Sequence, residues 1–196
     1  MSCTRLIPAL LALIGVMPLA LAAPEKDSSK ESIYDIEVLV FENKMPELVG
    51  EELFSRDTRP ATIRDLDKAV PPDSQQAEAL LHVAAEQLAK DGHYRLLTQA
   101  RWQQTVDPSG KGTVKPVRIS SGKDGELDGT IRFYMSRYLH LDVNLQFREA
   151  ESAGSAAMTY RMNEARRVKS QETHYFDHPR FGVLVRIMPV EKEKKS

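Results

Sequence analysis

The sequence contains a single cysteine, Cys3, which lies in the apolar amino-terminal segment. We expect that segment to be removed as an export signal, so the remaining chain has neither a disulfide nor a thiol nucleophile. Small secreted animal domains often depend on disulfides, whereas an exported domain without cysteine fits a bacterial periplasm. The chain also lacks an Asn-x-Ser/Thr glycosylation sequon, which agrees with this compartment.

Several catalytic signatures are absent as well. The chain has no Gly-x-Ser-x-Gly motif, no phosphate-binding glycine loop and no dinucleotide fingerprint. With 27 basic and 28 acidic residues, its formal net charge of −1 gives no general attraction to nucleic acid or anionic lipid. The sequence therefore argues against a serine hydrolase, a nucleotide-dependent enzyme and a nucleic-acid-binding protein, and we expect neither a cofactor nor a bound metal.

Residues 1–22 have the three parts of a secretory signal, which are a positive charge at Arg5, an apolar run and small residues near Ala22. A membrane anchor is the alternative interpretation. A spanning helix usually needs about 20 apolar residues, however, and two prolines interrupt this run near its ends. We therefore expect a cleaved signal peptide, a periplasmic protein without an integral membrane segment, and a flexible leader at 23–32.

The rest of the chain indicates one α+β domain over residues 33–190, followed by a disordered tail at 191–196. The segment IYDIEVLVF forms a first strand, and its continuously apolar second half predicts burial on both faces. Residues 42–73 combine several prolines with many charges, which indicates either small structural elements or a mobile binding loop. Apolar residues recur every three or four positions over 74–91 and predict the main helix, packed on one face of a mostly antiparallel sheet.

The longest alternation of apolar and polar residues runs from Leu127 to Phe147. Apolar side chains occupy the odd positions, and Arg137 interrupts them. Because strands rarely exceed about ten residues, we expect a bend or bulge near Ser136-Arg137. Residues 158–176 then return as the second arm of a long bent hairpin, and FGVLVRIM at 181–188 forms a central strand.

Arginine and aromatic residues gather around this expected bend. Arginine engages carboxylates through two parallel hydrogen bonds, and aromatic rings offer flat faces for sugars or apolar groups. The alternative is charge balancing across strands against Asp128, Asp142, Glu164 and Glu172. Arg137 stands apart, because a charge in an apolar register usually has a specific partner. The candidate ligand-binding residues are Arg137, Tyr138, His140, Arg166, Arg167, His174 and Tyr175.

A second group of residues has metal-binding and catalytic chemistry. His174, Asp177 and His178 lie close together in THYFDHP, and His140 lies on the neighbouring segment of the expected hairpin. A His-x-x-x-His spacing on a strand and turn does not bring both rings together as a helix would. The pattern therefore favours structural, hydrogen-bonded histidines, with Asp177 capping the turn.

The order of these motifs resembles one known family. The chain carries IYDIEVLVF, then YRLLTQARWQQ, GTIRFYMSRYLHLDVNLQF and RRVKSQETHYFDHPRFGVLVRI. This order is similar to that of the CsiV-type peptidoglycan-binding proteins of gammaproteobacterial periplasms. The resemblance implies a non-enzymatic protein that binds peptidoglycan. It also implies support for a bifunctional penicillin-binding synthase, together with the outer-membrane lipoprotein that activates this synthase.

Under this interpretation, arginines of the bend grip carboxylates of the peptide stems, while Tyr138, Tyr175 or Trp102 faces the sugars. Two other functions remain open. The chain could be an exported cell-wall hydrolase that uses His140, His174, Asp177 and His178, or a protein-interaction module without affinity for glycan.

Overall fold

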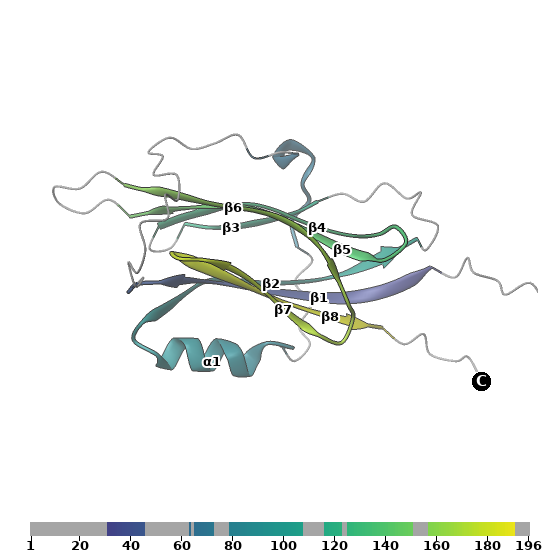
Figure 1. Cartoon of the computed structure of the whole chain (residues 1–196), viewed down its shortest axis with the longest axis horizontal. Coiled ribbons are helices and arrows are strands. Elements are labelled where there is room, and N and C mark those ends of the chain that lie inside the picture. The colour runs from purple at the N-terminus through teal and green to yellow at the C-terminus, as the bar shows by residue number, and fades with distance from the viewer. Residues whose placement is uncertain are drawn as a thin grey trace, which may run out of the picture.

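The computed structural model of the chain describes residues 31–45, 63, 65–72, 79–107, 116–122, 125–150 and 157–190. These residues form two four-stranded sheets that pack face to face, with one helix on the outer side of one sheet (Figure 1). All the neighbouring strands in both sheets are antiparallel, as the sequence predicts. The predicted signal peptide, most of the predicted leader and the predicted tail lie outside the described residues.

The first sheet contains, in spatial order, β2 (Tyr94–Val106), β1 (Ser32–Asn43), β8 (Phe181–Pro189) and β7 (Thr173–His178). The two strands with continuous apolar runs, β1 and β8, lie in the middle. Both faces of these strands are covered, and Leu39 on the outer face of β1 has no exposed surface. The predicted burial of the first strand and the predicted central place of the last strand are therefore confirmed.

The second sheet has the order β3 (Val117–Ser121), β4 (Gly125–Met135), β5 (Leu139–Glu149) and β6 (Thr159–Val168). The segment that follows β1, which the sequence predicts as a long loop at 42–73, is described only in part. Its described residues include a short 3-10 helix, η1, at Leu66–Lys68 and a parallel bridge from residue 70 to the start of β3.

The predicted bent hairpin is wrong, because the chain reverses completely where a bend was expected. Residues 136–138 form a turn, and β4 and β5 are adjacent antiparallel strands in which Met135 faces Leu139 and Leu127 faces Phe147. Directly opposite residues lie on the same face of a sheet. This turn pairs odd positions with odd positions, so the two-residue period continues unbroken through the reversal and gives no sign of it.

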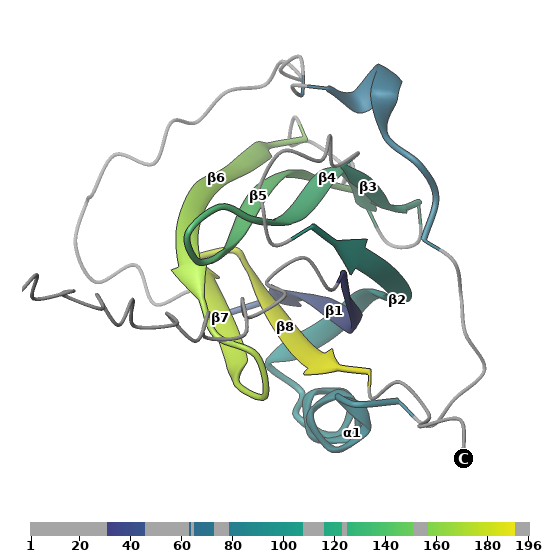
Figure 2. The same cartoon turned by 90° about the vertical axis from the view of Figure 1, so that its right-hand side faces the viewer.

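The predicted return segment at 158–176 is also divided. β6 ends beside β5, and the chain then crosses to the first sheet, where β7 pairs with β8 (Figure 2). The crossing includes Gln171, which has a left-handed φ of 67° and donates its N–H to the Ile187 carbonyl at 2.7 Å. The single sheet of the sequence prediction is therefore two sheets, and the predicted α+β fold with one main helix is largely β with one short α-helix.

The main core lies between the two sheets. Phe133 and Phe147 of the second sheet, and Phe176 and Phe181 of the first, have no exposed surface. Burying a side chain of this size contributes about 1.5–3 kcal/mol relative to leaving it in water. Trp102 of β2 belongs to the same core and is 4% exposed, so it cannot face a sugar as the sequence interpretation allowed.

The helix α1 (His82–Lys90) covers the outer face of the first sheet (Figure 1). It is shorter than the predicted helix at 74–91, whose first residues lie largely outside the described ones. Leu81, just before the helix, is buried with Leu39 in a second apolar cluster, and Ala85 and Leu88 of the helix pack against this cluster while remaining partly exposed. The buried carboxylate of Glu37 accepts the Leu81 N–H at 3.1 Å, where a negative charge suits the start of a helix.

Candidate functional site

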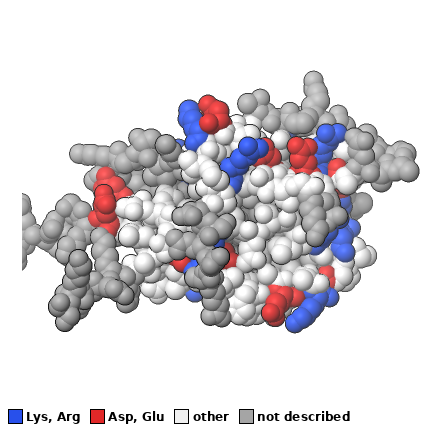
Figure 3. Space-filling model, turned by 180° about the vertical axis from the view of Figure 1, so that it is seen from behind, with Lys and Arg blue, Asp and Glu red and all other residues white. Residues whose placement is uncertain are grey.

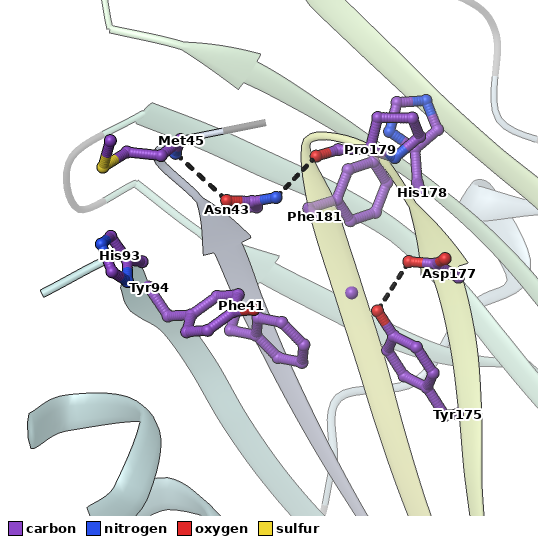
Figure 4. Close-up of a pocket in the computed structure, with 11 residues that line it drawn as sticks. Phe41, Asn43, Met45, His93, Tyr94, Tyr175, Asp177, His178, Pro179 and Phe181 are labelled. Carbon is purple, nitrogen blue, oxygen red and sulfur yellow. Dashed lines mark hydrogen bonds between the residues drawn. The ribbon is translucent and has the colours of Figure 1, made fainter. Parts of the chain in front are cut away.

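A pocket of about 540 Å³ hollows the outer face of the first sheet, at the end of β1 and beside the turn from β7 to β8 (Figure 4). Small-molecule sites commonly have volumes of roughly 300–1,000 Å³. Among the lining residues, only Tyr175 is a predicted ligand-binding residue. The lining residues are Phe41, Asn43, Met45, His93, Tyr94, Tyr175, Asp177, His178, Pro179, Phe181 and Gly182.

A glycine on a central strand lets two rings of the pocket wall come together. Gly182 of β8 lies in register between Phe41 of β1 and Asp177 of β7. A Cβ atom at Gly182 would lie 2.5 Å from Phe41 Cζ and 2.9 Å from Tyr175 Cε2. Because no Cβ is present, the Phe41 and Tyr175 rings approach each other across the glycine, nearly parallel at 9° and with centroids 6.3 Å apart.

A β-bulge brings a third ring to the pocket. The register of β1 against β2 shifts between Val40 and Phe41, and such a shift moves later side chains of a strand to its other face. Trp102 therefore points into the core, whereas Tyr94 lies on the outer face, although both occupy even positions. The Tyr94 ring meets Phe41 edge-on, with centroids 5.5 Å apart and an interplanar angle of 88°.

Hydrogen bonds hold the rim of the pocket in place. Asn43 Nδ2 donates to the Pro179 carbonyl at 3.2 Å, and Asn43 Oδ1 accepts the Met45 N–H at 3.1 Å (Figure 4). The backbone N–H of Asn43 donates to the Arg180 carbonyl at 2.9 Å. The end of β1 is thus tied to the β7–β8 turn, and a pocket formed in advance reduces the ordering cost of binding.

The polar groups of β7 face two different environments. Tyr175 donates its hydroxyl to Asp177 Oδ1 at 2.6 Å, and burial, followed by this hydrogen bond, raises the pKa of Tyr175. The Tyr175 hydroxyl therefore remains a donor. His178 is buried, and burial lowers its pKa. Its Nδ1 atom accepts the Arg180 N–H at 3.1 Å, which requires an unprotonated nitrogen.

A second candidate surface, the turn patch, consists of Arg137, Tyr138, His140 and Arg167 at the β4–β5 turn and the end of β6. The Tyr138 ring is exposed, and the Cζ atoms of Arg167 and Arg137 lie 3.6 and 5.6 Å from its centroid. Both distances permit cation–π attraction. His140 pairs with Arg167 across β5 and β6, and its Nε2 lies 3.1 Å from Ser136 Oγ. Two positive charges are thus gathered around one exposed ring.

Arg166 does not belong to the turn patch. It precedes Arg167 on a strand, and successive side chains of a strand point to opposite faces. The Arg166 Cζ atom lies 3.7 Å from the ring centroid of buried Phe176, and its guanidinium donates to Glu164 at 3.0 Å. Arg137 was expected to have a specific partner, and its guanidinium lies over the Tyr138 ring. Arg137 belongs to the turn between β4 and β5, so it does not interrupt the apolar face of a strand.

The four residues of the alternative hydrolase are held in separate places. His140 lies on the second sheet, whereas Asp177 bonds to a tyrosine of the first sheet and His178 is buried. His174 Nε2 lies 2.8 Å from the Lys169 carbonyl and closes the turn before β7. At about 3.3 Å per residue, the Cα atoms of His174 and His178 lie roughly 13 Å apart along the strand. Within the described part of the chain, no three metal-ligating side chains converge.

Charges on the rear face of the molecule are mixed in sign (Figure 3). Elsewhere on the second sheet, Arg118 donates to Asp128 and Arg132 donates to Asp142, each at 3.0 Å between neighbouring strands. These pairs show the charge balancing that was the alternative interpretation of the arginines. Among the described residues on this face, no broad field of one sign gathers of the kind that attracts nucleic acid (Figure 3).

Comparison with known proteins identifies the family of the chain. A family model described as "Peptidoglycan-binding protein, CsiV" matches residues 67–190, which is more than half of the chain. The match includes the turn patch and the part of the pocket formed by β2, β7 and β8, whereas β1 lies outside it. No curated protein and no solved structure matches the chain. The described residues include no helix with the length and apolar character of a membrane span.

Proposed function

Because the chain belongs to the CsiV family of peptidoglycan-binding proteins, we propose that it binds peptidoglycan in the cell envelope without cleaving it. The match over residues 67–190 carries this proposal. The separate surroundings of the candidate catalytic histidines support the non-catalytic part. We further propose that residues 1–22 direct export to the periplasm, where the protein supports a bifunctional penicillin-binding synthase and its outer-membrane lipoprotein activator.

The turn patch is the proposed contact with the peptide stems. These stems carry carboxylates, and Arg137 and Arg167 supply two guanidinium groups that can each engage a carboxylate through paired hydrogen bonds. Neither arginine forms an ion pair with a described carboxylate. Tyr138 places both cations at one exposed position, so the patch concentrates positive charge on a surface whose overall charge is balanced.

Pelleting of intact sacculi tests the proposed function. We expect the mature protein to pellet with sacculi, and we expect retention to fall as salt shortens the screening length from about 10 Å at 0.1 M to about 3 Å at 1 M. No soluble wall fragments should appear. Release of fragments that a chelator suppresses would instead favour a metal-dependent hydrolase. Protein that stays in the supernatant would favour a protein-interaction module.

A double variant tests the contribution of the turn patch. We expect Arg137→Ala/Arg167→Ala to weaken sacculus retention by about tenfold, because the charge-assisted contacts are lost. The control variant Arg118→Ala/Lys68→Ala removes the same charge from two ion pairs elsewhere whose cations are exposed, and ion pairs at the surface contribute little to stability. Equal retention of the two variants would exclude the turn patch as the contact.

A further inference from the structure

We propose that the pocket at the end of the first sheet is a sugar-binding site, which takes an uncharged N-acetylated pyranose ring of the glycan strand. This assignment rests on the proposed function, since peptidoglycan supplies the ligand. It separates recognition of the glycan, at the pocket on the first sheet, from recognition of the stem carboxylates, at the turn patch on the second sheet.

The aromatic side chains provide the platform that a sugar ring requires. Tyr175 is 45% exposed, although it lies on a strand of a packed sheet, and its hydroxyl bond to Asp177 fixes the orientation of the ring. The face of an aromatic ring carries partial negative charge, which attracts the C–H groups on the face of a pyranose. Phe41 and Tyr94, at right angles to each other, form a rigid apolar floor beside this platform (Figure 4).

Gly182 allows the aromatic rings of the platform to pack closely against the sheet. A glycine inside a strand weakens the strand, and it often marks a position where a ligand or another backbone comes near. Over Gly182 the Phe41 and Tyr175 rings come so close to the strand that a Cβ atom would lie 2.5 Å from Phe41 Cζ and 2.9 Å from Tyr175 Cε2. The position of the Tyr175 platform beside Phe41 therefore depends on a glycine at this place on a central strand, and the wall of the pocket is set by rings that are already packed.

The charge of the pocket selects a neutral ligand. Asp177 is the only carboxylate among the lining residues that the structure describes, and these include no lysine or arginine. One carboxylate oxygen holds the Tyr175 hydroxyl, so the second can accept a hydrogen bond from a sugar hydroxyl. The same negative charge repels the carboxylates of a peptide stem. Sugar hydroxyls fit this pocket, whereas the acidic stem fits the turn patch.

The test uses a tetramer of β-1,4-linked N-acetylglucosamine, a neutral oligosaccharide without peptide stems, in titration calorimetry with the mature protein. We expect saturable binding that changes little with salt, because no charged group of the ligand takes part. Tyr175→Ala should weaken this binding by about tenfold through loss of the stacked ring. Tyr175→Phe keeps the ring and should lose less affinity.

Val83→Ala is the control, because it shortens an exposed apolar side chain of α1 that belongs neither to the pocket nor to the turn patch. It should bind the oligosaccharide as the wild type does. Fluorescence of Trp102, the only tryptophan and a core residue, reports whether each variant is folded. A wild-type protein that pellets with sacculi but ignores the oligosaccharide would overturn the sugar site and leave the proposed function intact. Unchanged oligosaccharide affinity in a folded Tyr175→Ala variant would also overturn the sugar site. A protein that binds neither ligand would overturn both proposals.

Discussion

Substitution of Gly182 by alanine tests how the pocket is built. The new Cβ atom would lie 2.5 Å from Phe41 Cζ and 2.9 Å from Tyr175 Cε2, both well inside van der Waals contact. Tyr175 is 45% exposed but can move outward only by giving up its hydroxyl bond to Asp177, and Phe41 is 6% exposed and packs against Tyr94. Overpacking of this kind costs about 1–3 kcal/mol. Replacement of glycine also reduces the entropy of the unfolded chain, which stabilises by about 0.4–1 kcal/mol.

The two effects give an expected loss of about 1–2 kcal/mol in the free energy of unfolding for Gly182→Ala. Guanidinium denaturation followed by Trp102 fluorescence measures this loss. Gly122→Ala is the control, because a Cβ atom there meets nothing within 4 Å; it should be neutral or stabilise the fold slightly. If Gly182→Ala were as stable as Gly122→Ala, the close approach of the two rings across the glycine would be refuted.

Two further predictions concern buried polar groups. Burial lowers the pKa of His178 below 6.5 in the folded protein. Just below pH 6.5, the unfolded chain therefore binds more protons than the folded protein. The free energy of unfolding should fall as the pH is lowered through 6.5. His178→Asn keeps an acceptor for the Arg180 N–H but cannot titrate. Denaturation at several pH values should show that the free energy of unfolding depends less on pH in this variant than in the wild type. An unchanged pH dependence would exclude His178 as its cause. Glu37→Ala removes the buried acceptor of the Leu81 N–H and should destabilise the fold by about 1–3 kcal/mol in the same assay. A neutral effect would show that this contact does not anchor the helix.

Local patterns predicted much of the secondary structure. Continuous apolar runs identified the central strands β1 and β8, and the helical stripe identified the element that covers the first sheet. The sequence pattern did not predict the reversal between β4 and β5, because the turn leaves apolar residues on odd positions in both strands. Arg137 was the sign of this turn in the sequence, because a charged residue that interrupts an apolar alternation is also typical of a turn.

The candidate sites depended on contacts that sequence spacing does not reveal. Arg166 and Arg167 are adjacent in the chain, yet they lie on opposite faces of β6. The pocket joins Phe41, Tyr94 and Tyr175, which come from three strands. Predicting it would have required knowledge of the strand register in the first sheet and of the bulge between β1 and β2. Gly182, inside the apolar run FGVLVRIM, was the available signal, because an isolated glycine in a strand suggests close approach.

Recognition of peptidoglycan by these two surfaces can be observed residue by residue. The most direct measurement adds a purified disaccharide-peptide fragment of peptidoglycan to the isotope-labelled mature protein and follows its backbone amide NMR signals. We expect saturable shifts at Tyr175 and Gly182 of the pocket and at Tyr138 and Arg167 of the turn patch, with the sheet core unchanged. A spectrum in which neither surface responds to the fragment would contradict peptidoglycan binding through either of them.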